Sequence, residues 1–242
     1  MKPVTCIAFV AVLACTFNTS AQQTEVAQKN EQQQQLERAL ESLNTVISDV
    51  PSRHHHDRAE ILFRLGRFEE AIKDYDTSIQ FKWPHDDNSC WERGLAQYYA
   101  GDFQAGAEQF VRYHRVGALD IENGIWRFLC IAEAEGIEKA RAMILHYPRK
   151  MRNPFPSLLD LYLGEGKSEA VLEEANRDVT SEEERTTNAF NAHYYLAKYY
   201  DITDQTTLAR THIQKALEYR IPHFMYACAQ IDAERLQVAN NE

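Results

Sequence analysis

The sequence predicts an all-α protein built from a row of similar helical hairpins, and two observations support this. The segment Leu65-Gly66-Arg67-Phe68 recurs 35 residues later as Ala100-Gly101-Asp102-Phe103. Trp91 likewise returns as Trp126, at the same spacing. A fixed period of this length is typical of helical-repeat proteins, in which each unit buries its apolar face only against its neighbours. We therefore expect a solenoid of stacked hairpins.

Each position of the predicted unit carries a residue suited to it. Gly66, Gly101 and Gly136 would end the first helix of successive hairpins, where a left-handed residue is needed. Small residues are expected where the two helices of a hairpin cross closely, at Ala71 and Gly106. Larger side chains would fill the space between hairpins, at Tyr75 and Phe110.

Two further units are degenerate but share the same spacing. The fourth contains Phe155, Leu159, Tyr162, Gly166 and Val171. The fifth contains Leu196-Ala197, Tyr200, Ala209 and Ala216. The sequence thus predicts about five hairpins over residues 52–221. Residues 36–51, which end at Pro51, are expected to form an N-terminal capping helix, a half-hairpin, and residues 222–242 a C-terminal capping helix.

The N-terminus has the features of a secretory signal peptide over residues 1–21. Met1-Lys2 gives a positive start, residues 3–14 are apolar, and Thr19-Ser20-Ala21 offers small residues before a polar stretch. Cleavage after Ala21 would release the chain. In the alternative, the segment ending at Cys15 resembles a lipobox, and Cys15 would be lipidated. Residues 22–35 are rich in glutamine and are expected to be a flexible tether.

Composition narrows the possible functions. The chain has 26 Lys and Arg against 36 Asp and Glu, a net charge of −10. Loss of residues 1–21 removes only Lys2, which leaves −11. An acidic chain of this kind does not predict a nucleic-acid surface. Beyond residue 21 the cysteines are Cys90, Cys130 and Cys228, an odd and sparse set that predicts buried thiols and no disulfide framework.

The repeat motifs resemble those of the tetratricopeptide-repeat (TPR) proteins. More narrowly, the chain resembles NlpI-type envelope lipoproteins and planctomycete-type exported TPR proteins. This likeness rests on residues 92–101 (ERGLAQYYAG), 126–130 (WRFLC) and 194–200 (YYLAKYY). It implies a scaffold that docks envelope hydrolases or proteases, often as a homodimer.

In a TPR array, side chains from the first helix of each unit line a concave groove. The register set by the glycines predicts that a peptide or protein partner contacts aromatic, amide and basic side chains: Arg53, His56, Arg64, Asn88, Trp91, Tyr98, Tyr99, Asn123, Trp126, Asn191, Tyr194 and Lys198. Two alternatives stay open. The tryptophans could pack in the core, and the asparagines could be helix N-caps.

Other candidate chemistry is weak. His54-His55-His56-Asp57 is histidine-rich, but consecutive residues of a helix point about 100° apart and cannot converge on one ion. Glu182-Glu183-Glu184 fits the favourable start of a helix. The sequence contains no phosphate-binding glycine loop, nucleophile elbow or zinc-ligand spacing. No metal or other cofactor and no catalytic residue is expected.

The function expected from the sequence is a non-enzymatic adaptor exported to the periplasm or cell envelope, which binds other proteins. One alternative is a periplasmic hydrolase or metal-dependent enzyme on a helical-repeat scaffold. Another is a structural subunit of an assembly.

Overall fold

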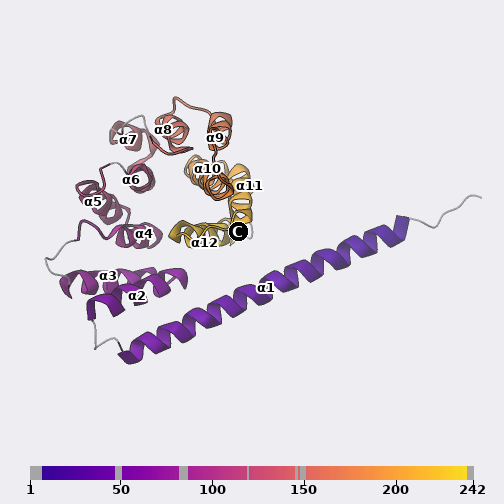
Figure 1. Cartoon of the computed structure of the whole chain (residues 1–242), viewed down its shortest axis with the longest axis horizontal. Coiled ribbons are helices and arrows are strands. Elements are labelled where there is room, and N and C mark those ends of the chain that lie inside the picture. The colour runs from indigo at the N-terminus through magenta and orange to yellow at the C-terminus, as the bar shows by residue number, and fades with distance from the viewer. Residues whose placement is uncertain are drawn as a thin grey trace, which may run out of the picture. The chain divides into compact units, whose positions relative to one another are not determined.

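The computed structural model describes residues 7–46, 51–81, 87–118, 120–144, 147 and 151–238, and this part of the chain is helical, with no strand. It divides into two compact units, residues 1–50 and 51–242. Figure 1 shows the long helix of the first unit and the coil of shorter helices of the second. Among the residues described, no helix is both long and apolar enough to cross a membrane.

The first unit contains one helix, α1 (Ile7–Val46). The prediction of a flexible tether over residues 22–35 is therefore wrong, because these residues lie within α1. Residues 22–46 contain no glycine or proline, and the Gln, Glu, Leu and Ala that dominate them are good helix formers. Of the predicted signal peptide, residues 1–6 lie outside the described residues. Of the segment predicted as an N-terminal capping helix, residues 36–46 form the end of α1, residues 47–50 lie outside the described residues, and Pro51 begins the next helix.

The second unit contains the five predicted hairpins, which confirms the all-α solenoid. They are α2 (Pro51–Arg64) with α3 (Phe68–Phe81), α4 (Trp91–Tyr99) with α5 (Phe103–His114), α6 (Ile121–Glu135) with α7 (Ile137–Ala142), α8 (Phe155–Leu163) with α9 (Ser168–Ala175), and α10 (Glu182–Ile202) with α11 (Thr206–Glu218). Neighbouring first helices contact one another in the order α4, α6, α8 and α10. A last helix, α12 (Phe224–Val238), follows the array.

The glycines end the first helices as the repeat predicts. Gly66, Gly101 and Gly136 have φ angles of 75°, 80° and 90°. The fourth hairpin differs, because Gly164 (φ 83°) is the left-handed C-cap there. The predicted Gly166 lies two residues further on, against the backbone of Leu161. The turn residue is thus displaced in the degenerate repeat, while its conformation is kept.

Close crossing of helices is confirmed at the second hairpin. A Cβ on Gly106 would lie 3.3 Å from the carbonyl oxygen of Gly94, so α4 and α5 approach at this point. A Cβ on Gly94 would lie 2.8 Å from the ring of Phe110, which is 1% exposed. In the first hairpin, Ala71 and Tyr75 are fully buried. The small and aromatic positions therefore pack as the sequence predicts.

Candidate interaction site

The residues expected to line the groove lie on α2, α4, α6 and α10 and just before α4, and five of them meet in the centre of the second unit. We call Tyr98, Tyr99, Trp126, Tyr194 and Lys198 the central cluster. The Trp126 ring lies 5.2 Å from Tyr98 and 6.3 Å from Tyr194, measured between centroids. The Lys198 ammonium lies 4.6 Å from the Tyr98 ring and 5.4 Å from the Trp126 ring, within reach of a cation–π interaction.

Helix α12 covers this cluster. Asp232 of α12 accepts hydrogen bonds from the hydroxyls of Tyr99 and Tyr194, at 2.8 and 3.1 Å. Its other oxygen lies 3.1 Å from the Lys198 ammonium and 3.1 Å from the Arg235 guanidinium. Asp232 and Lys198 are each 1% exposed. A buried carboxylate with four donors around it fixes the position of α12 against α4 and α10.

A second contact holds the start of α12. The Phe224 ring lies 4.8 Å from Phe63 of α2 and 5.4 Å from Trp91 of α4, again between centroids. The Arg64 guanidinium stacks over the same ring at 5.4 Å. Helix α12 packs against α11 as well as α2. It therefore does more than cap the last hairpin, because it joins the last hairpin to the first two (Figure 1).

The expectation of an open aromatic groove is wrong over the central cluster. Tyr98 is 2% exposed, Trp126 1% and Tyr194 0%. Trp126 is thus a core residue, whereas Trp91 is half-buried on Phe224. The repeat register correctly locates the inner face of each helix. It carries no information on whether a later helix of the same chain covers that face.

The asparagines are not helix N-caps. The N-cap of α4 is Cys90, that of α6 is Asp120, and that of α10 is Ser181. Asn123 lies inside α6 and donates to Asp120, at 2.7 Å. Asn191 lies in the middle of α10 and is 3% exposed. Both are therefore part of the packed interior, and Asn88 precedes α4 as a half-buried turn residue.

Apart from Tyr99, which is half-buried within the central cluster, the predicted groove residues that keep solvent exposure form a rim. We define the rim as Arg53, His56 and Arg64 of α2 with Asn88 and Trp91 beside the start of α4. Arg53 and Arg64 are exposed, and the other three are half-buried. Eleven residues separate the two arginines, which is close to three helical turns, so both project from one face of α2. The rim is thus the part of the predicted surface that lies outside the central cluster and is open to solvent.

Burial sets the electrostatics of the central cluster. Burial raises the pKa of Tyr98, Tyr99 and Tyr194. Burial alone would lower the pKa of Lys198, but the Asp232 carboxylate together with Tyr98 and Asp201 leaves that pKa raised. The Lys198 ammonium therefore stays charged near neutral pH. The hydrogen bonds and the ion pair of this cluster hold α4, α10 and α12 together.

Cys90, Cys130 and Cys228 are buried, as the sequence predicts. Burial raises the pKa of Cys130 and of Cys228. A thiol with a raised pKa is a poor nucleophile and a poor metal ligand.

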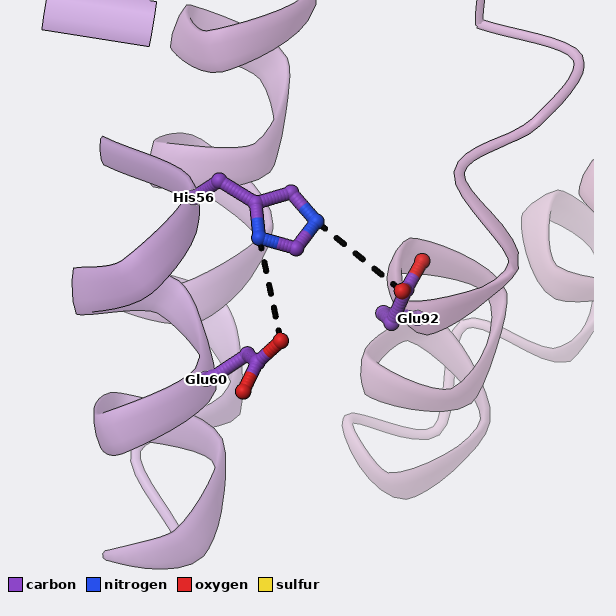
Figure 2. Close-up of side chains that lie close together, drawn as sticks. All are labelled: His56, Glu60 and Glu92. Atoms are coloured by element: carbon purple, nitrogen blue, oxygen red, sulfur yellow. Dashed lines mark ion pairs between the residues drawn. The ribbon is translucent and has the colours of Figure 1, made fainter. Parts of the chain in front are cut away.

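The side chains of the histidine tract, residues 54–57 at the start of α2, face different partners. The His55 imidazole lies 2.7 Å from Asp74 of α3, and Asp57 lies 3.8 Å from Arg53. His56 instead faces two carboxylates that the sequence analysis did not single out, Glu60 of α2 and Glu92 of α4 (Figure 2). Glu60 is four residues from His56 on one helix face, which sequence could have shown. Glu92 required the stacking of the hairpins.

Comparison with known proteins agrees with this architecture. No family model matches the chain. Among solved structures, the chain is similar to a tetratricopeptide repeat protein from Parabacteroides merdae, with a TM-score of 0.50 and 13% sequence identity. The match covers 86% of this chain and 80% of that chain. At this identity the likeness concerns the fold. Together with the five hairpins, it shows a TPR-like helical-repeat fold.

Proposed function

We propose that the protein is an exported, non-enzymatic scaffold of the cell envelope that binds partner proteins through the rim. The observation that carries this proposal is that the inner surface of this TPR-type array has a covered part and an accessible part. Its centre is filled by α12, while Arg53, Arg64 and Trp91 stay accessible at one edge. Exposed arginines beside an aromatic ring suit a partner segment with acidic and aromatic residues.

Exchange of α12 for a partner helix is the competing arrangement, and its cost disfavours it. Removal of α12 would separate Lys198 from Asp232 inside the array. Breaking a buried ion pair costs about 3–5 kcal/mol, a large share of the roughly 5–15 kcal/mol that stabilises a whole domain. A partner would have to supply an equivalent buried carboxylate. Docking at the rim needs no such replacement.

Export is proposed from the features of residues 1–21. The mature chain would begin at Gln22, or at a lipidated Cys15. Intact-mass measurement of the native protein distinguishes the two, and recovery of the uncleaved chain from the cytoplasm would contradict export. The partners proposed from the sequence resemblance are envelope hydrolases or proteases, with a second copy of the chain as another candidate.

The rim is tested by affinity capture from an envelope extract with three baits. An Arg64→Glu bait should lose the proteins that the wild-type chain captures. An Arg220→Glu bait carries the same charge change at an exposed position after α11 and should keep them. Thermal melts of both variants check that α12 remains in place. Equal capture by the two variants would refute docking at the rim.

An Asp232→Asn bait distinguishes exchange of α12 from docking at the rim. If a partner replaced α12, loosening the helix would increase capture. If partners bind the rim, capture should change little. A steep increase with Asp232→Asn would therefore favour exchange and overturn the arrangement proposed here.

A further inference from the structure

The seam between the first two hairpins brings together three side chains that ligate metal ions in other proteins. His56 and Glu60 come from α2, and Glu92 comes from the first turn of α4 (Figure 2). With one ligand atom taken from each residue, the three atoms all lie within 4.8 Å of one another. The side chains of His56 and Glu60 are 34% and 38% exposed, and that of Glu92 is 14% exposed. The group is thus open to entry of an ion and still held by packed helices.

The distances in this group suit an ion better than direct pairing. The His56 Nδ1 lies 3.8 Å from Glu60, and the other ring nitrogen, Nε2, lies 3.9 Å from Glu92; both distances are too long for hydrogen bonds. In a tetrahedral zinc site, ligand atoms about 2.0–2.2 Å from the ion lie roughly 3.4 Å from one another. One imidazole nitrogen would bind the ion. Rotation of the two flexible Glu side chains would then close the difference in distance.

A second observation points to the same place. Tyr75 of α3 is fully buried, and its hydroxyl has no hydrogen-bond partner among the described residues. Its ring lies edge-on to His56, with 5.4 Å between centroids. An orphaned buried hydroxyl is costly, and it could donate to a water on the ion or to a carboxylate that moves to bind it.

We propose that His56, Glu60 and Glu92 bind one divalent transition-metal cation, for which Zn²⁺ is the best-suited probe. One imidazole and two carboxylates are ligands that zinc accepts, and the imidazole disfavours Ca²⁺ and Mg²⁺. The ion neutralises two carboxylates that face each other across the seam. It joins α2 to α4 next to Trp91, and a position left by the three protein ligands takes water or a donor from a partner.

The test uses the full chain, freed of metal by dialysis against a chelator and titrated with Zn²⁺ in a calorimeter. We expect one equivalent to bind. Glu92→Gln and His56→Gln should each weaken binding at least tenfold, since loss even of an outer-shell group costs about 10–100-fold in metal affinity. Titration with Co²⁺ should give visible absorption bands, which His56→Gln removes. Circular dichroism of each variant without metal shows whether the fold is kept.

The matched control is His54→Gln, which removes a neighbouring imidazole of the same helix and should leave the affinity within about twofold, because His54 is not one of the three ligands. Equal loss of affinity in His54→Gln and His56→Gln would show adventitious binding to the histidine tract and overturn the proposal. The same conclusion follows if Glu92→Gln binds Zn²⁺ as the wild type does. Glu60→Gln gives an independent check should Glu92→Gln fail to fold.

Discussion

Neutralising Asp232 tests whether α12 is held by the central cluster. Asp232 is 1% exposed and accepts from Tyr99, Tyr194, Lys198 and Arg235. Asp232→Asn keeps an acceptor for the tyrosine hydroxyls but leaves the Lys198 ammonium buried without its counterion. Removal of one partner from a buried ion pair costs about 3–5 kcal/mol. Because the hydrogen bonds are partly kept, we expect a loss near the lower value, about 3 kcal/mol.

The assay is thermal unfolding followed by circular dichroism. For a folded unit of this size, each kcal/mol shifts Tm by about 2–4 °C, so Asp232→Asn should lower Tm by roughly 6–12 °C. Hydrogen exchange should show the largest loss of protection in α12. Glu234→Gln is the matched control, because it removes the same kind of charge from an exposed position of α12. It should change stability by no more than about 0.5 kcal/mol.

A double-mutant cycle tests the ion pair itself. Lys198→Met alone leaves Asp232 without its buried cation, whereas Lys198→Met/Asp232→Asn leaves neither charge. Replacing a whole buried pair is often neutral, so the double variant should recover much of the loss, with a coupling of about 2 kcal/mol or more. Additive losses, or an Asp232→Asn variant as stable as Glu234→Gln, would refute the role given to this pair.

Three further predictions concern pH and packing. Burial and the neighbouring His212 lower the pKa of His193 to about 4, below its ordinary value of about 6.5. The folded chain then binds fewer protons than the unfolded chain between these values, so stability should be complete above about pH 6.5 and fall as pH drops towards 4. Between pH 7 and pH 5, the free energy of unfolding of the wild type should fall by about 1 kcal/mol more than that of His193→Gln, with allowance for the partial exposure of His193. Urea unfolding at both pH values measures this, and equal losses would contradict the prediction. Gly101→Ala should cost about 1–2 kcal/mol in the same assay, because φ is 80° with open space around the added methyl, and Gly101→Asn should cost less. Gly106→Ala should lower the free energy of unfolding by about 1–3 kcal/mol, because its Cβ would lie 2.9 Å from the Cys130 sulfur. Adding Cys130→Ala to the same chain should restore part of this stability. If it restores none, the contact with Cys130 is not the source of the strain.

The repeat architecture could be predicted because its signals are local. A glycine that ends a helix adopts the same positive φ wherever its turn occurs, so Gly66, Gly101 and Gly136 reveal the period directly. The shift from Gly166 to Gly164 shows the limit of this argument. Where the repeat is degenerate, two glycines stand close together, and the choice between them depends on packing against α8 rather than on spacing.

The closure by α12 could not be predicted, because it depends on contacts between residues distant in sequence. Asp232 is 133 residues from Tyr99 and 38 from Tyr194. Nothing in the sequence around Asp232 marks it as buried, since a lone carboxylate in a C-terminal helix usually faces solvent. The same holds for the group around His56, in which Glu92 comes from the next hairpin. The repeat register predicts which residues of each helix point inward, whereas the residues that they contact depend on the tertiary structure.

Closure of the array by α12 also changes which hairpins depend on one another for stability. In an open solenoid each repeat contacts only its neighbours, so stability is approximately a sum of local terms. Here α12 contacts α11 and α2, and Trp91 and Tyr99 of the second hairpin hold its two anchoring side chains, Phe224 and Asp232. Loss of the second hairpin would therefore remove a repeat and also release α12 from the central cluster. The first, second and last hairpins should consequently unfold together, and the rim beside Trp91 stays in place only while the array is closed.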